Sequence, residues 1–413
     1  MVKLLFRMPK NKRFLPLILV LTAAAFLIFF PSEQNEDPVR IGATMSKTGD
    51  YNTQGIAAAN GYRLWEKHIN EAGGLLGRPV EFIIYDDASD PDKAISLYEK
   101  LIREEQVDLV MGPYGSTLTE AVAPVTEKYS MVQISPLGAT TSIWEQGREY
   151  LFMVLPPAEL FLGGLIDMAG ERGLEKVAII YQDELFPEAA GLGAVEMARE
   201  RGMEVVVEES YPTGTEDFLP YLQKVEETGA QALGMAASPL DDFIRAAAQM
   251  EANNIHVKMF ATSGAVQQFQ DALGKTAEYT YGLSAWEPSL PYPGIERFTN
   301  DYRETYQLEP SFHAAGAYGS CQLLQKAVEK AGSLDADAIR RELLNLETQT
   351  IFSDFAVDDR GYQIANTGVF IQWQDGKKEV VWPDEYATAE PRFPTPPWHQ
   401  REQTEPGETG YGL

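Results

Sequence analysis

The 413-residue chain has a single cysteine, Cys321, and four histidines. One thiol excludes an internal disulfide, a zinc site built on several cysteines and an iron–sulfur cluster. The histidines are scattered, without the spacing of metal ligands, at His68, His256, His313 and His399. The sequence also lacks a P-loop and a nucleophile elbow. We therefore expect a protein that is not an enzyme and has neither a metal site nor a cofactor.

Basic residues are scarce as well. The chain has 34 Lys and Arg against 61 Asp and Glu, which gives a net charge of −27. Binding to nucleic acid depends on clustered basic side chains, so nucleic acid is excluded as a main partner. A hydrophobic content of 44% is typical of a globular protein, and the length fits two domains.

The N-terminal segment differs from the rest of the chain. Residues 1–30 hold five basic residues and no acidic one, and an apolar run extends from Phe14 to Phe30. This layout is typical of an export signal, and the run is at the lower length limit of a membrane span. Because no small residues mark a cleavage site near Phe30, we expect residues 1–37 to be an uncleaved signal-anchor and linker. A cleaved signal is the alternative; either way the body lies outside the cytoplasm, in the periplasm or at the outer face of the membrane.

From Val39 onward, short apolar runs alternate with stretches of helical periodicity. The first strand–helix pairs are 39–45 with 53–72 and 80–87 with 91–106. Such alternation predicts right-handed crossovers and a parallel sheet. The pattern restarts after Pro156-Pro157, with strands expected at 176–183, 204–210, 232–238 and 257–264. The sequence therefore predicts an α/β protein with two doubly wound lobes.

The last third of the chain does not repeat this pattern. It predicts three helices followed by antiparallel strands over 352–383. We expect lobe 1 to comprise residues 38–157 and 288–366, lobe 2 to comprise 158–287 and 367–383, and 384–413 to form an extended tail rich in Pro and Glu.

Three strand-to-helix loops are candidates for ligand binding. Ligands of open α/β sheets lie beyond the carboxyl ends of the strands, where helix N-termini point. The loops at 112–117 and 136–141 are rich in small and hydroxyl residues that could donate hydrogen bonds to a small anion. Thr117 and Glu120 fit a capping box, so helix capping without a ligand is the alternative. The loop at 183–187 could present Phe186 to a cleft.

At these loops the chain resembles the extracytoplasmic binding proteins of branched-chain amino acid ABC transporters, the leucine/isoleucine/valine-binding-protein-like members of the type I periplasmic binding protein family. The resemblance covers about 39–383 and is carried by INEAGGLLGRPVEFIIYDDASDP (69–91), GPYGSTLTEAVAPVTEK (112–128) and ISPLGATTS (134–142). It implies a type I periplasmic-binding fold, in which two doubly wound parallel-sheet lobes are joined by three crossovers and close on a ligand in the cleft between them.

The resemblance also implies ligand-binding residues. Ser116 matches the serine that holds the ligand's carboxylate through its hydroxyl and N–H groups. Gly138, Ala139 and Thr140 match the loop that holds the carboxylate and amino groups. The other candidates are Tyr51 and Gln54 near the side-chain wall, Phe186 and Phe312 as pocket aromatics, and Tyr114 in the loop of Ser116.

One position departs from the family pattern. The acidic residue that pairs with a ligand's ammonium is replaced by Ser263, whose neutral hydroxyl cannot supply that charge pairing. Either another acid, such as Asp183, Glu184 or Asp241, supplies the charge, or the ligand lacks an ammonium group.

The resemblance implies the solute-binding component of an ABC importer, which delivers its ligand by cleft closure to permease subunits with cytoplasmic ATPases. We expect a small carboxylate or amide ligand, first of all a branched-chain, apolar or aromatic amino acid, and a monomeric body. One alternative is a binding protein for a non-amino-acid ligand such as an amide, urea or aromatic acid. The other is a receptor ectodomain that acts with a separate signalling partner.

Overall fold

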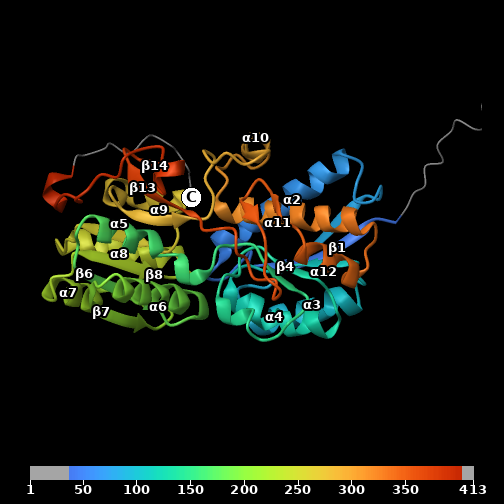
Figure 1. The fold of residues 1–413 in the computed structure, drawn as a ribbon, viewed down its shortest axis with the longest axis horizontal. Coiled ribbons are helices and arrows are strands. Elements are labelled where there is room, and N and C mark those ends of the chain that lie inside the picture. Colours follow the sequence, from blue (N-terminus) through green and yellow to red (C-terminus); the bar gives the residue numbers. More distant parts are fainter. Residues whose placement is uncertain (1–36, 402–413) are drawn as a thin grey trace, which may run out of the picture. The chain divides into compact units, whose positions relative to one another are not determined.

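Two β-sheets organise the part of the chain that the computed structural model describes, residues 37–401 (Figure 1). The predicted signal-anchor and the end of the predicted tail, residues 1–36 and 402–413, lie outside the described residues. Within residues 37–401, no helix combines the length and the apolar character needed to cross a membrane.

The first sheet has five parallel strands in the order β2-β1-β3-β4-β5. Its strands are β1 (Val39–Met45), β2 (Val80–Asp86), β3 (Leu109–Met111), β4 (Gln133–Ser135) and β5 (Leu151–Met153), and its crossover helices are α2 (Asn52–Glu71), α3 (Pro91–Arg103) and α4 (Ser116–Lys128). Six of the seven residues of β1 are buried, as expected of a strand covered by helices on both faces. α3 begins at Pro91, because Asp90 caps its N-terminus by accepting from the N–H groups of Asp92 and Lys93.

The second sheet has seven strands in the order β14-β13-β10-β9-β8-β6-β7. The parallel part contains β6 (Lys176–Gln182), β7 (Glu204–Tyr211), β8 (Ala232–Ala236), β9 (Met259–Thr262) and β10 (Tyr281–Ser284), with helices α5 (Gly163–Glu171), α6 (Leu185–Glu200), α7 (Leu219–Glu227), α8 (Leu240–Ala252) and α9 (Gln267–Leu273). The antiparallel hairpin β13 (Val369–Gln374) and β14 (Lys377–Trp382) extends the sheet. Its turn residues Asp375 and Gly376 both have positive φ, as a two-residue hairpin requires.

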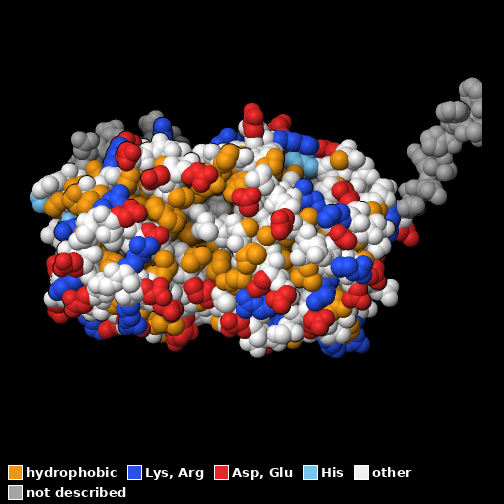
Figure 2. Space-filling view, in the orientation of Figure 1, with side chains coloured by type: hydrophobic (Ala, Val, Ile, Leu, Met, Phe, Trp, Pro, Cys, Tyr) orange, Lys and Arg blue, Asp and Glu red, His pale blue; other side chains and the backbone are white. Residues whose placement is uncertain are grey.

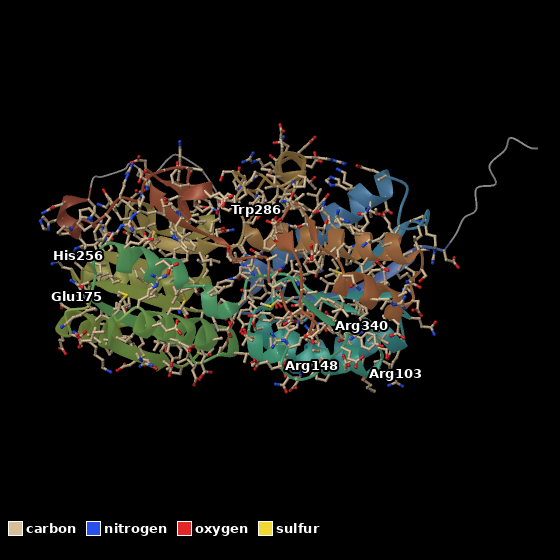
Figure 3. The ribbon with its side chains drawn as sticks, viewed as in Figure 1. Arg103, Arg148, Glu175, His256, Trp286 and Arg340 are labelled. Atoms are coloured by element: carbon tan, nitrogen blue, oxygen red, sulfur yellow. The ribbon has the colours of Figure 1, made fainter. Side chains whose placement is uncertain are left out.

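Three later helices pack on the first sheet's side of the molecule (Figure 1): α10 (Ile295–Tyr306), α11 (Phe312–Ala331) and α12 (Ala336–Leu344). α11 lies against α2, where Gly61 allows the close approach because a Cβ there would meet the backbone of Ala314. The chain therefore passes between the two sheets three times: after β5, after β10, and between β12 (Asp354–Phe355) and β13. Trp286 is buried at the second of these crossings and donates to the carbonyl of Ile351 over 2.8 Å (Figure 3).

These features confirm the predicted two-lobe α/β fold. We call the first sheet with α2–α4 and α10–α12 lobe 1, and the second sheet with α5–α9 lobe 2; the predicted boundary residues stay a prediction. The short strands β5 and β11 (Thr348–Gln349) were not predicted from the sequence. The remaining elements are 3₁₀ turns at Thr141–Ile143, Ala158–Leu160, Gly274–Ala277, Asp384–Tyr386 and Trp398–Gln400.

Residues 384–401, expected to form an extended tail, contain two 3₁₀ turns and no α-helix or strand. They are hydrogen-bonded to lobe 2. The indole of Trp398 donates to the carbonyl of Ile255 over 2.8 Å, and the N–H of Thr395 donates to the carbonyl of Lys258 over 3.0 Å. This part of the segment is therefore packed on the folded body.

Candidate functional site

A cavity of about 680 Å³, counted out to its open mouth, lies between the two lobes. Its lobe 1 wall comes mainly from the segments that follow β1, β3 and β4, and its lobe 2 wall from those that follow β6, β8 and β9. In each sheet the strand order reverses between two of these strands, β1 and β3 in lobe 1 and β6 and β8 in lobe 2. Such a switch point leaves a crevice at the carboxyl ends of the strands, so the topology itself positions the cavity.

The cavity wall is largely apolar and aromatic. Its apolar members are Leu118, Leu137, Leu155, Phe161, Phe186, Ala237, Leu240, Phe243, Val266 and Phe312, together with the rings of Tyr51 and Tyr114. Its hydrogen-bonding side chains are Gln54, Ser116, Thr117, Ser238, Ser263 and His313. Within residues 37–401, no Asp, Glu, Lys or Arg lines this cavity. On the face shown in Figure 2, apolar side chains gather across the middle of the molecule, with acidic and basic ones distributed around them.

Seven of the ten predicted site residues lie on this wall: Tyr51, Gln54, Tyr114, Ser116, Phe186, Ser263 and Phe312. The structure does not bring Gly138, Ala139 and Thr140 to the wall. The N–H groups of Ala139 and Thr140 instead donate to Oγ of Ser116, over 3.0 and 3.2 Å. Gly138 packs against Thr119. The loop therefore positions Ser116, and its own contact with a ligand stays a prediction.

Ser116 is the first residue of α4 and is 2% exposed. A hydroxyl has two acceptor positions and one proton to donate. Because the N–H groups of Ala139 and Thr140 use the acceptor positions, the O–H remains to donate into the cavity. Gly115 precedes it with φ of 77°, a conformation that favours glycine, and no side chain caps this helix end. Ser116 and the first N–H groups of α4 thus form a donor site suited to a carboxylate or carbonyl oxygen.

The capping box predicted for this helix is wrong. The N-cap is Gly115, and Thr117 lies inside the first turn. The carboxylate of Glu120 is held by the guanidinium of Arg148, with Oε1 2.7 Å from Nη2 and Oε2 2.5 Å from Nη1. This bidentate pair turns Glu120 away from the capping role.

The acidic residues offered as partners for a ligand ammonium do not face the cavity. Glu184 accepts from the hydroxyl of Tyr51 over 2.8 Å and from Thr213 over 3.1 Å. Asp183 and Asp241 are exposed, and Asp241 lies 3.8 Å from the guanidinium of Arg245. Ser263 does line the cavity, and its hydroxyl accepts from the N–H of Ala237 over 3.3 Å. In the part of the chain that the structure describes, the cavity wall therefore offers hydroxyl groups and no carboxylate to an ammonium.

Among the described residues, three side-chain hydrogen bonds join lobe 1 to lobe 2 beside the cavity. They run from the hydroxyl of Tyr51 to Glu184, from the amide of Gln54 to the carbonyl of Ser238 over 3.2 Å, and from the hydroxyl of Thr140 to the carbonyl of Leu185 over 3.3 Å. Burial and the charge of Glu184 raise the pKa of Tyr51 well above its ordinary value, so this hydroxyl keeps its proton and donates. These contacts hold the two walls of the cavity together.

His313 lines the cavity although the sequence did not identify it as a site residue. It is the second residue of α11 and is 6% exposed. Burial, and secondarily the positive charge of Lys378, lower its pKa to about 3, so the imidazole is neutral at physiological pH. The one sequence signal was its position directly after Phe312, which was a predicted pocket aromatic.

Comparison with known proteins gives a family match and relatives over most of the chain. Residues 38–378 match the family model described as periplasmic binding protein. The Leu/Ile/Val-binding protein homolog 7 of Brucella melitensis biotype 1 is 24% identical over 379 residues, which cover 86% of this chain and 94% of that protein.

Two solved structures share the fold. One is the branched-chain amino acid transporter substrate binding protein LivJ of Streptococcus pneumoniae in complex with isoleucine, with a TM-score of 0.75, 22% identity, and coverage of 83% of this chain and 98% of the other. The second is a solute binding protein of an ABC transporter from Rhodopseudomonas palustris in complex with 3,4-dihydroxybenzoic acid, with a TM-score of 0.73, 21% identity, and coverage of 83% and 95%. Both similarities confirm the two-lobe architecture.

Proposed function

Since the chain belongs to the periplasmic binding protein family, a family of binding proteins and not of enzymes, we propose that it is the extracytoplasmic solute-binding component of an ABC importer. We further propose that its ligand is a small apolar or aromatic carboxylate, or the corresponding amide, without an ammonium group. The observation that carries this proposal is the cavity wall, which combines hydroxyl and N–H donors at the start of α4 with apolar and aromatic side chains and, within residues 37–401, no charged group.

The electrostatics of the wall favour an anion at one end of the ligand. A carboxylate at Ser116 meets the remaining O–H donor and the N-terminal N–H groups of α4, where the helix dipole favours negative charge. An ammonium elsewhere in the cavity would lose its hydration without gaining a carboxylate partner, at a cost of several kcal/mol. A zwitterionic amino acid is therefore at a disadvantage relative to the same skeleton without its amino group.

An amino acid is the second candidate, and it is favoured by the relatives. The Brucella protein bears the name of a Leu/Ile/Val-binding protein homolog, and the Streptococcus protein was solved with isoleucine. For this ligand, Glu184 would have to leave Tyr51 and Thr213 and turn toward the ammonium. The Rhodopseudomonas protein supports the first candidate, because its ligand is an aromatic carboxylate that has no ammonium.

In the proposed function, binding and delivery depend on closure of the two lobes. The ligand would bridge the walls, and the three hydrogen bonds between the lobes would form as they meet. The closed form would then be recognised by permease subunits that work with cytoplasmic ATPases. We expect the body to act as a monomer.

The test uses matched ligands that differ only in the amino group. Thermal unfolding and calorimetry are measured with leucine and 4-methylpentanoate, and with phenylalanine and 3-phenylpropanoate. A ligand that binds the folded state raises the melting temperature by mass action. We expect the acid of at least one pair to bind at least about tenfold more tightly than its amino acid, a difference of about 1.4 kcal/mol. Tighter binding of the amino acid in both pairs would refute the ligand assignment.

We also propose that residues 1–37 are retained as a membrane anchor on the outer face of the cytoplasmic membrane. The support is the basic and then apolar sequence of residues 1–30. N-terminal sequencing of the protein recovered from the membrane fraction should begin at or near Met1. A freely soluble chain that begins near Ser32 would show that the signal is cleaved.

A further inference from the structure

His313 and Tyr114 are two neighbouring polar side chains in the cavity wall. The rings come from different elements, α11 and the loop before α4, and their centroids are 5.6 Å apart. Within residues 37–401, no residue forms a hydrogen bond with a ring nitrogen of His313 or with the hydroxyl of Tyr114; His313 is 6% exposed and Tyr114 is half-buried. Because the polar atoms of both side chains remain accessible in the cavity, they are free to form hydrogen bonds with a group of the ligand.

The other buried polar side chains of the wall are already engaged. Ser116 and Ser263 accept from backbone N–H groups, and Gln54 donates to Ser238. These bonds hold the wall together and leave the O–H of Ser116 for the carboxylate of the ligand, while His313 and Tyr114 are two neighbouring wall side chains with no hydrogen bond to another described residue. The pair is therefore distinct from the donor site at Ser116.

The charge around this pair defines what it can bind. Lys378 of β14 acts on His313 and is itself paired with Glu287 over 2.6 Å, with both side chains largely buried. The charge of Glu184 acts on Tyr114. A neutral imidazole has one donor and one acceptor nitrogen, and a protonated phenol can also donate and accept. Burial raises the pKa of Tyr114 well above its ordinary value, so both groups are uncharged at physiological pH. Neither group carries a negative charge that could pair with an ammonium, and neither carries a positive charge that could pair with a second carboxylate.

We infer that His313 and Tyr114 form a second polar subsite that binds a neutral hydroxyl or carbonyl group of the ligand. The preferred ligand is then a monocarboxylate that carries such a group, an apolar or aromatic hydroxy or oxo acid. This inference rests on the proposed function, because the carboxylate is taken to bind at Ser116. A ligand hydroxyl would donate to one member of the pair and accept from the other.

The experiment compares benzoate with 3,4-dihydroxybenzoate by calorimetry. Because a neutral hydrogen bond contributes about 0.5–1.5 kcal/mol, wild-type protein should bind the hydroxylated acid about two- to tenfold more tightly. His313→Phe keeps an aromatic ring but removes both nitrogens, so the preference for the hydroxylated acid over benzoate should disappear. Tyr114→Phe should reduce the same preference. His256→Phe is the matched control, because His256 lies in lobe 2 away from the cavity (Figure 3) and its replacement should leave both affinities unchanged.

Each outcome decides the inference. Equal affinities for the two acids in wild-type protein, or an unchanged preference in a folded His313→Phe variant, would overturn the subsite while leaving the proposed ligand class intact. Tighter binding of the amino acid in both matched pairs, with no binding of benzoate or 3,4-dihydroxybenzoate, would overturn the proposed ligand class and the subsite with it.

A measurement on wild-type protein covers the case in which His313→Phe fails to fold. With ¹⁵N-labelled histidine, the imidazole that stays neutral to the lowest pH is that of His313. Its ring nitrogen signals should shift on addition of 3,4-dihydroxybenzoate and not on addition of benzoate. The same response to both acids would overturn the subsite.

Discussion

The hydrogen bond from Tyr51 to Glu184 should contribute directly to ligand affinity, because it joins the lobes beside the cavity. Tyr51→Phe removes a hydroxyl that donates to a carboxylate over 2.8 Å. Hydrogen bonds to charged groups contribute about 1.5–3 kcal/mol, and the lower end applies here because water can reach the half-buried Glu184. If binding requires closure, a loss of about 1.5 kcal/mol from the closed form lowers the affinity about tenfold.

The assay is calorimetry with the tightest ligand from the matched pairs, together with solution scattering. In Tyr51→Phe the ligand should bind about tenfold more weakly, and the unliganded particle should be larger than in wild-type protein. Tyr85→Phe is the matched control, because the hydroxyl of Tyr85 donates to Glu105 over 2.6 Å within lobe 1. It should lower the melting temperature without changing affinity. An affinity within twofold of wild type in Tyr51→Phe, or an equal loss in Tyr85→Phe, would refute the closure argument.

Four further predictions concern single side chains. Ser116→Ala should weaken carboxylate binding by about 1.5–3 kcal/mol, or 10- to 150-fold by calorimetry, with under threefold indicating that the carboxylate binds elsewhere. Thr140→Ala should have a smaller effect, about two- to tenfold, because its hydroxyl bonds to Leu185 and not into the cavity. Ser263→Glu should shift preference from 4-methylpentanoate toward leucine by adding a carboxylate to the wall, and an unchanged ratio would show that Ser263 is remote from the amino end. Asp242→Asn should stabilise the fold at neutral pH and not at pH 3.

The two lobes could be predicted from the sequence because strands that are buried on both faces appear as apolar runs and because capping residues mark the ends of helices. β1 is an apolar run, and Asp90-Pro91 marks the start of α3 as a cap followed by proline. β5 escaped prediction because three residues, Leu151–Met153, are too few to show a period, and pairing with β4 defines them as a strand.

The candidate site was predictable at the level of loops and less so at the level of side chains. Strand ends at a switch point converge, which pointed to the loops of Ser116 and Phe186, whereas Ser263 was identified through the family resemblance; all three line one cavity. Whether a loop group faces the cavity depends on hydrogen bonds between distant segments, and the N–H groups of Ala139 and Thr140 turned out to be used by Ser116. Nothing in the sequence around His313 distinguishes it from other residues of a helix. Only its burial in the cavity wall identifies it as a site residue.

The prediction for Asp242 follows from its burial in the first turn of α8. Its side chain is 3% exposed and accepts from the hydroxyl of Tyr211 over 3.1 Å. Burial raises its pKa from the ordinary value of 3.8 to about 6, although Tyr211 and Arg245 act in the opposite direction. Because the folded pKa lies above the unfolded one, stability is greatest below about pH 3.8 and falls as the pH rises through 6. A shift of this size corresponds to roughly 3 kcal/mol at most.

Asp242→Asn keeps an acceptor for Tyr211 and removes the charge, so it should raise the free energy of unfolding by up to about 3 kcal/mol at pH 7.5 and leave it nearly unchanged at pH 3. Urea unfolding of both proteins at the two pH values measures this difference. Asp241→Asn is the matched control, because Asp241 is the exposed neighbour and its replacement should change stability by less than about 0.5 kcal/mol at either pH. If Asp242→Asn gained as much at pH 3 as at pH 7.5, relief from a buried charge could not be the cause, and the gain would have to come from packing of the amide against Tyr211.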